Sequence, residues 1–164
     1  MNLKQSVLVA GNWKMNPSTL IEAKRLFLAV KKGLGNRRLK TDVIIAPPVL
    51  FITELAKLAT GKKIELAAQT AFPATVGAHT GEISMLMLQG VGVNGVIVGH
   101  SERRALGESD ADVGVRVQTA VGLGANVIVC VGERKRDKDG NYLALIEKQI
   151  RSALAGITAN SLVL

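Results

Sequence analysis

Short apolar runs recur along the chain, and segments with a helical spacing of apolar residues separate them. Each run is apolar at consecutive rather than alternate positions, which is typical of strands with both faces buried. The predicted strands are residues 7–10, 42–46, 64–68, 95–98, 126–131 and 161–164. Strands of this kind occur in parallel sheets that helices cover on their faces.

The segments between the runs predict helices. Thr19 and Glu22 form a capping box at the start of the first helix, and Gly33 or Gly35 ends it. The predicted helices are residues 19–35, 49–58, 83–88, 110–121 and 142–154. The alternation of strand and helix predicts an α/β fold with parallel strands, in a single domain over residues 1–164.

The composition narrows the class of protein. Apolar residues make up 48% of the 164 residues and aromatic residues only 3%, so aliphatic side chains must fill the core. No apolar run approaches the roughly 20 residues that span a bilayer, and the N-terminal apolar stretch is too short for a signal peptide. A single cysteine, Cys130, excludes an internal disulfide and CxxC-type metal spacing. We therefore expect a soluble protein of the cytoplasm, with no membrane partner and no metal site.

The charge balance favours anionic ligands without pointing to nucleic acid. The chain carries 21 Lys and Arg against 13 Asp and Glu, for a net charge of +8. Such a balance attracts phosphates of every kind. The basic residues are scattered, however, and few aromatic side chains are available to stack on bases. We expect a solvated basic surface and no nucleic-acid partner.

One glycine motif is misleading. "GVGVNG" at residues 90–95 matches the G-x-G-x-x-G fingerprint of dinucleotide-binding folds. That fingerprint requires a strand before it and a helix after it, so that the helix N-terminus meets the pyrophosphate. Here the predicted order is helix first and strand second. We interpret these residues as tight-turn glycines and expect no nicotinamide cofactor.

Polar side chains follow four of the predicted strands at the point where each strand ends. Asn12 and Lys14 follow the first, Gln69 the third, His100 the fourth and Glu133 the fifth. The carboxyl ends of the strands in βα proteins share one rim, where binding and catalytic groups gather. The sequence therefore predicts a shared pocket at this rim.

His100 is the sharpest feature of the rim. Ser101, Glu102 and the residue after them are predicted to begin a helical turn whose N-terminus lies against the imidazole. A helix N-terminus disfavours a cationic ring, so we expect a neutral imidazole that can donate a hydrogen bond to a carbonyl oxygen. The alternative is an ordinary polar residue at a strand end.

Lys14 and Asn12 allow two interpretations each. A fixed ammonium group at Lys14 could neutralise a phosphate or a developing oxyanion, or Lys14 could simply begin a solvated loop. Asn12 is either a turn residue or a donor to an oxyanion. Glu102 could act as a general base, although its place between Ser101 and an arginine suits an ion pair that orients Lys14.

Four motifs together resemble the triosephosphate isomerase family in order and spacing. They are "AGNWKMN" (residues 10–16), "HTGEIS" (79–84), "VGHSERR" (98–104) and "CVGE" (130–133), and the likeness covers essentially the whole chain. The resemblance implies a TIM-type (β/α) barrel. It also implies interconversion of D-glyceraldehyde 3-phosphate and dihydroxyacetone phosphate through an enediolate, in glycolysis and gluconeogenesis, with no cofactor. In the family's known chemistry a glutamate base acts with a neutral histidine.

The resemblance also assigns roles. His100 would polarise the substrate carbonyl, Lys14 and Asn12 would bind substrate and stabilise charge, and Ser101 and Glu102 would support them. Thr80, in the long loop after the third strand, would reach into the pocket of a neighbouring subunit, with Gln69 at the same interface. Cys130 would be a packing residue near the site.

The chain departs from the family's pattern in length. A complete (β/α)8 barrel takes about 250 residues, and the 164 residues here predict about five βα units plus a sixth strand, an incomplete barrel. The family's catalytic glutamate follows the sixth strand in a stretch resembling Tyr-Glu-Pro-Val-Trp, and this sequence ends at Leu164, about where that stretch begins. Smaller departures are Thr70, His79 and Leu106, which stand where the family usually has other residue types.

Three hypotheses follow. The chain is part of an isomerase that needs a complementing C-terminal fragment to supply the carboxylate and the lid. Alternatively, it is a shortened isomerase that forms a homo-oligomer and uses another carboxylate, such as Glu133, Glu108 or one from a neighbour. The third hypothesis is a non-catalytic oligomeric or phosphate-binding protein that keeps the isomerase fold.

Overall fold

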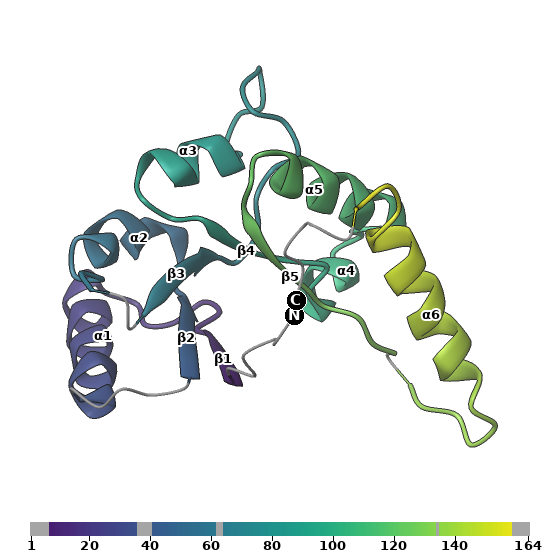
Figure 1. The fold of residues 1–164 in the computed structure, drawn as a ribbon, viewed down its shortest axis with the longest axis horizontal. Helices are drawn as coiled ribbons and strands as arrows, with labels where there is room; N and C mark the ends of the chain where they lie inside the picture. The colour runs from purple at the N-terminus through teal and green to yellow at the C-terminus, as the bar shows by residue number, and fades with distance from the viewer. Residues whose placement is uncertain (1–6, 36–40, 62–63, 134, 159–164) are drawn as a thin grey trace. The chain divides into compact units, whose positions relative to one another are not determined.

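The computed structural model describes residues 7–35, 41–61, 64–133 and 135–158, and they cluster in two compact units. Unit 1 comprises residues up to Gln69 together with Gln89–Val93, and unit 2 comprises Thr70–Leu88 and the residues from Asn94 onward. Figure 1 shows the strands and helices that make up each unit. The single domain expected over residues 1–164 stays a prediction.

Unit 1 is a three-stranded parallel sheet with two helices. Strands β1 (Val7–Asn12), β2 (Thr41–Ala46) and β3 (Glu65–Ala68) pair in that order, and the helices are α1 (Leu20–Leu34) and α2 (Val49–Ala56). Asn12, the last residue of β1, lies opposite Ala46, the last residue of β2. The two strands therefore end at the same level, which brings the residues that follow β1 to the rim.

Helix α1 packs against α2 through buried apolar side chains and one ion pair. Phe27 of α1 and Leu55 of α2 are fully buried, while Nζ of Lys24 lies 2.7 Å from a carboxylate oxygen of Glu54. Thr19 caps α1 as predicted, since its hydroxyl accepts a hydrogen bond from the backbone N–H of Glu22 at 3.3 Å.

Unit 2 holds a parallel pair of strands and the remaining helices. Strands β4 (Gly95–Val98) and β5 (Asn126–Val129) pair residue for residue along their whole length. The helices are α3 (Met85–Gly90, whose last two residues fall in unit 1), α4 (Ser101–Ala105), α5 (Asp110–Gly122) and α6 (Asn141–Ala153). Helices α5 and α6 lie side by side (Figure 1).

A glycine sets the close approach of α5 to α6. A Cβ added at Gly114 of α5 would lie 2.9 Å from the backbone oxygen of Ser152 in α6. The Ser152 hydroxyl also donates a hydrogen bond to the carbonyl of Asp110 at 3.0 Å. Since no larger side chain fits at this crossing, the composition of α5 determines how near α6 can pack.

The alternation of strands and helices predicted from the sequence is confirmed, with small shifts of the boundaries. Strand β1 continues two residues past the predicted end because Gly11 and Asn12 pair with β2, and β5 ends two residues early, at Val129. The predicted strand at residues 161–164 lies outside the described residues. The motif at residues 90–95 starts at the last residue of α3 and ends at the first residue of β4, so the predicted order of helix first and strand second is confirmed.

No helix in the described part of the chain is both long enough and apolar enough to cross a bilayer.

Candidate active site

The chain leaves β1 through a strained residue. Lys14 has φ +55°, and it is the one non-glycine residue with positive φ among those that the structure describes. This conformation costs on the order of 1–3 kcal/mol for a residue with a Cβ atom and persists where the surroundings impose it. Oδ1 of Asn12 accepts a hydrogen bond from the backbone N–H of Lys14 at 2.9 Å, which supports the turn.

Gln69 holds the other side of the same turn. Its side-chain Nε2 donates to the carbonyl oxygen of Lys14 at 2.8 Å and to that of Ala46 at 2.9 Å. The backbone N–H of Trp13 donates to the same Ala46 oxygen at 3.0 Å. Side-chain and backbone groups that follow β3 and β1 thus converge at the end of β2.

His100 follows β4 through a glycine turn. Gly99 has φ +74°, and a Cβ added to it would lie 3.0 Å from the carbonyl oxygen of Cys130. Only glycine combines this conformation with this close approach. The turn places His100 at the N-cap of α4, with its side chain about one-fifth exposed. The helical turn predicted after His100 is confirmed.

The hydrogen bond at the helix start fixes the protonation pattern of the His100 ring. Nδ1 of His100 accepts from the backbone N–H of Glu102 at 3.2 Å, so Nδ1 carries a lone pair. The neutral ring then bears its proton on Nε2. A carboxylate oxygen of Glu102 lies 3.6 Å from Nδ1, which is beyond hydrogen-bond distance. The backbone contact is the closer one and leaves Nε2–H as the donor.

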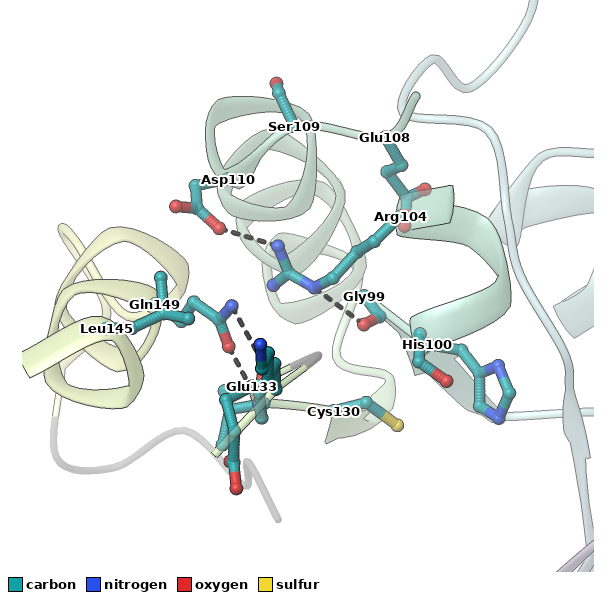
Figure 2. Close-up of a pocket in the computed structure, with 14 residues that line it drawn as sticks. Gly99, His100, Arg104, Glu108, Ser109, Asp110, Cys130, Glu133, Leu145 and Gln149 are labelled. Atoms are coloured by element: carbon teal, nitrogen blue, oxygen red, sulfur yellow. Dashed lines mark hydrogen bonds and ion pairs between the residues drawn. The ribbon is translucent and has the colours of Figure 1, made fainter. Parts of the chain in front are cut away.

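A hollow of about 920 Å³ lies beside His100 in unit 2 (Figure 2). Residues of the β4–α4 turn, the start of α5, the segment after β5 and helix α6 line it. They are Gly99, His100, Ser101, Arg104, Glu108, Ser109, Asp110, Cys130, Val131, Gly132, Glu133, Lys135, Leu145 and Gln149. In the described part of the chain, no group of three His, Cys, Asp or Glu side chains could hold a metal ion.

Arg104 organises this hollow, a role that its neighbours in the sequence do not indicate. Its Nε donates to the carbonyl oxygen of Gly99 at 2.9 Å and its Nη1 lies 2.6 Å from a carboxylate oxygen of Asp110 (Figure 2). The arginine therefore ties the glycine turn before His100 to the first residue of α5. The two arginines that end the motif VGHSERR are visible in the sequence, but their partners depend on the fold.

The side-chain amide of Gln149 supports the side of the hollow opposite His100 by bonding the backbone of Gly132. Oε1 of Gln149 accepts from the backbone N–H of Gly132 at 2.8 Å, and its Nε2 donates to the Gly132 carbonyl at 3.2 Å.

Burial raises the pKa of the Cys130 thiol, and Arg104 opposes this effect. A thiol with a raised pKa is a poor nucleophile, which agrees with a packing role for Cys130.

The two carboxylates considered as substitute bases are both engaged. Glu108 is almost fully buried, with Oε1 at 2.9 Å from Nε of Arg116 and 3.9 Å from Nε of Arg103. Oε1 of Glu133 accepts from Nε of Arg136 at 2.7 Å. Backbone hydrogen bonding and the arginine lower the pKa of Glu133. A carboxylate with a lowered pKa is a weaker proton acceptor.

The loop between β3 and α3 is anchored from α5. Arg116 donates to the carbonyl oxygen of Ala71 and lies over the Phe72 ring, 5.9 Å from its centroid. The His79 ring packs against the same phenylalanine at a centroid distance of 4.4 Å. Thr80 follows His79 and is exposed.

The structure brings the predicted site residues together in two groups. Asn12, Lys14 and Gln69 meet in unit 1, and His100, Ser101 and Glu102 lie together at the start of α4 in unit 2. Thr80 also belongs to unit 2 but is not brought to this group by any contact that the structure describes. Their roles in binding and catalysis remain predictions.

Comparison with known proteins gives one consistent result. A family model described as triosephosphate isomerase matches residues 7–164. A "Triosephosphate isomerase" of Xanthobacter autotrophicus is 41% identical over the whole chain, which covers 65% of that relative. Proteins with the same name from Bradyrhizobium diazoefficiens and Chlorobium chlorochromatii are 41% and 39% identical over 95% and 92% of the chain, which covers 62% and 60% of them. The chain thus spans about three-fifths of the length of these relatives.

Proposed function

Because the chain belongs to the triosephosphate isomerase family, we propose that it carries the histidine and lysine part of a site that interconverts D-glyceraldehyde 3-phosphate and dihydroxyacetone phosphate. Its alternating strands and helices are those of an incomplete TIM-type (β/α) barrel. One observation carries the proposal, namely the hydrogen bond from Glu102 N–H to Nδ1 of His100.

This hydrogen bond suits His100 to the reaction. Isomerisation removes a proton from the carbon beside a carbonyl and passes through an enediolate. An Nε2–H aimed at the carbonyl oxygen stabilises the charge that develops there and can exchange its proton between the two oxygens of the intermediate. The tautomer that the Glu102 N–H selects already carries the proton on Nε2, so the donor needs no rearrangement when substrate binds.

Lys14 supplies the positive charge in this proposal. Its ammonium group neutralises the substrate phosphate and the developing oxyanion. The left-handed backbone of Lys14, at the end of β1, supports this role. The side-chain oxygen of Asn12 accepts the hydrogen bond from the Lys14 N–H, so its amide nitrogen is the group that donates to the substrate in this proposal. Ser101 and Glu102 support His100 from the first turn of α4.

The proton-abstracting base comes from outside the 164 residues in this proposal. Glu108 and Glu133 are held by arginines, which argues against either as a substitute. The carboxylate is then supplied by a complementing C-terminal segment or by a neighbouring chain. Without it, catalysis loses a contribution typically worth about 10²- to 10⁴-fold.

We further propose that the chain forms a homo-oligomer through the loop that carries Thr80, and that it works in the cytoplasm. The exposed position of Thr80 fits such a contact. The alternative is an oligomeric or phosphate-binding protein that keeps the fold without turnover.

A coupled assay with glyceraldehyde 3-phosphate tests the proposal. The chain is assayed alone and with the C-terminal part of the Xanthobacter autotrophicus relative, and each mixture is repeated with His100→Ala. We expect little turnover by the chain alone and turnover on mixing that falls by at least about 100-fold in His100→Ala. Equal rates with and without His100 would exclude the proposal and favour the non-catalytic alternative.

A further inference from the structure

Arg104 donates hydrogen bonds to the two backbone carbonyls on either side of the His100 Cα atom. Its side-chain Nε donates to the carbonyl oxygen of Gly99 at 2.9 Å, and its backbone N–H donates to the carbonyl oxygen of His100 at 3.0 Å. The first carbonyl belongs to the peptide unit before His100 Cα and the second to the peptide unit after it. One residue thus contacts both peptide units that define φ and ψ of His100, which are −56° and 141°.

The side-chain contact is the one that depends on an arginine. The backbone bond from Arg104 to His100 has the i to i−4 pattern of an α-helix, and any residue except proline can make it at this position. The bond to Gly99 needs a donor along the side chain. Replacement of Arg104 therefore removes the contact with the peptide unit before His100 and leaves the helical bond in place.

The turn at Gly99 needs contacts from other residues to fix its conformation. Gly99 has φ +74°, and glycine has no side chain that would confine it to this value. The guanidinium lies directly against the turn, because a Cβ added at Gly99 would be 3.2 Å from Nη2 of Arg104. The bond from Nε of Arg104 is one of the contacts that can keep the turn in a single conformation.

Asp110 fixes the guanidinium from another helix. Nη1 of Arg104 lies 2.6 Å from a carboxylate oxygen of Asp110, and the two side chains are only 13% and 25% exposed (Figure 2). Solvent ions screen a partly buried pair of this kind weakly. Helix α5, which begins at Asp110, is held in place by fully buried Val113 and Val117. A planar guanidinium that bonds through Nε and Nη1 at once has little freedom to rotate.

We propose that Arg104 is a positioning residue for His100. Held by Asp110, its Nε fixes the peptide unit between Gly99 and His100 and so sets the direction in which the imidazole leaves the backbone. The aim of the imidazole at a substrate carbonyl rests on the proposed function, whereas the effect on the His100 backbone does not. Arg104 acts through His100 in this proposal and not on the substrate itself.

Three variants separate the parts of this proposal. Arg104→Met keeps an unbranched side chain but has no donor. Arg104→Lys keeps the charge, but a single terminal nitrogen would then have to serve Gly99 and Asp110 together. Asp110→Asn keeps the arginine and weakens the ion pair that fixes it. Arg151→Met is the matched control, because Nε of Arg151 likewise bonds a carboxylate, that of Glu147 at 2.8 Å, within α6.

Two measurements compare the variants with the unaltered chain. The three-bond HN–Hα coupling of His100 reports φ, and titration with dihydroxyacetone phosphate reports affinity. We expect a larger coupling in both Arg104 variants, because φ is no longer confined near −56°. The affinity should fall roughly tenfold, as for the loss of one hydrogen bond from a charged donor. Asp110→Asn should shift the coupling in the same direction, and Arg151→Met should change neither quantity.

An unchanged His100 coupling in a folded Arg104→Met chain would overturn the positioning role, and so would a changed coupling with unchanged affinity. Full recovery of both quantities in Arg104→Lys would show that charge alone suffices, against the role given to Nε. Unfolding midpoints check the fold, and if Arg104→Met does not fold, an unchanged coupling in Asp110→Asn refutes the proposal. If the unaltered chain binds no dihydroxyacetone phosphate, the proposed function fails, while the coupling still decides whether Arg104 holds the His100 backbone.

Discussion

Nδ1 of His100 lies 3.2 Å from the backbone nitrogen of Glu102 and 3.6 Å from a carboxylate oxygen of the same residue. The two contacts favour opposite forms of the ring. The N–H requires a lone pair on Nδ1, whereas the carboxylate would attract a protonated Nδ1. The shorter contact has the geometry of a hydrogen bond and decides the form of the ring.

The imidazole nitrogens of His100 provide the first prediction. In ¹⁵N NMR spectra at pH 8, we expect the proton on Nε2 and an unprotonated Nδ1. Glu102→Ala removes the carboxylate but keeps the backbone donor, so the tautomer should be unchanged. A proton on Nδ1 in the unaltered chain that is lost in Glu102→Ala would contradict the prediction. It would show that the Glu102 carboxylate, and not the backbone N–H, determines which nitrogen is protonated.

The crossing of α5 and α6 gives a prediction about stability. In Gly114→Ala the new methyl group would meet the Ser152 carbonyl at 2.9 Å, so we expect a loss of about 1–3 kcal/mol in the free energy of unfolding. Gly122→Ala in the same helix is the control, because a Cβ there has no neighbour within 4 Å. Alanine should stabilise that position by up to about 1 kcal/mol. Urea unfolding measures both, and equal effects would contradict the close packing.

A prediction about pH follows from Glu54. Hydrogen bonds from the ammonium groups of Lys24 and Lys57 lower the pKa of its carboxyl from 4.5 to about 2. The lower pKa belongs to the folded state, so the ionised Glu54 carboxylate with its two lysines stabilises the fold above pH 4.5. This stabilisation is lost as the pH falls from 4.5 towards 2.

We therefore expect Glu54→Gln to be less stable than the unaltered chain at pH 7, with the difference shrinking below pH 4.5. Urea unfolding at pH 7 and pH 3 measures this change, and the exposed Glu65→Gln on β3 serves as control. A Glu54 carboxyl that titrates near 4.5 in ¹³C spectra would contradict the prediction.

The oligomer provides a further prediction. If the loop with Thr80 forms the contact between chains, light scattering should give a mass above that of one chain, and Thr80→Arg should lower it by placing a charge in the contact. Thr53→Arg, on an exposed position of α2, should leave the mass unchanged. A stable, monodisperse monomer of the unaltered chain would contradict the proposed homo-oligomer.

The strands and helices could be predicted because their signals are local. Residues 95–98 are buried on both faces, as their continuous apolar run indicates, and Thr19 caps α1 through a residue three positions away. Even the helical turn after His100 follows from the order of its residues. The ends of the strands are harder to predict from the sequence. Strand β1 reaches Asn12 because this residue pairs with Ala46 of β2, which lies far away in the sequence.

The supporting contacts of the site could not be predicted in this way. The interface role expected for Gln69 stays a prediction, whereas the hydrogen bond from its amide to the Lys14 carbonyl, 55 residues away, was not expected. Arg104 stands in the histidine motif, but nothing in its neighbours indicates that it bonds Gly99 and Asp110. Such contacts depend on how turns from different strands meet in space.

In the proposed function, His100 and Lys14 act on the same triose phosphate. Titration of the isotopically labelled chain with dihydroxyacetone phosphate, following the His100 imidazole and the Lys14 side chain in the same NMR spectra, tests it most directly. We expect both resonances to shift and to saturate with one dissociation constant. A response at only one of the two residues, or two distinct dissociation constants, would contradict it.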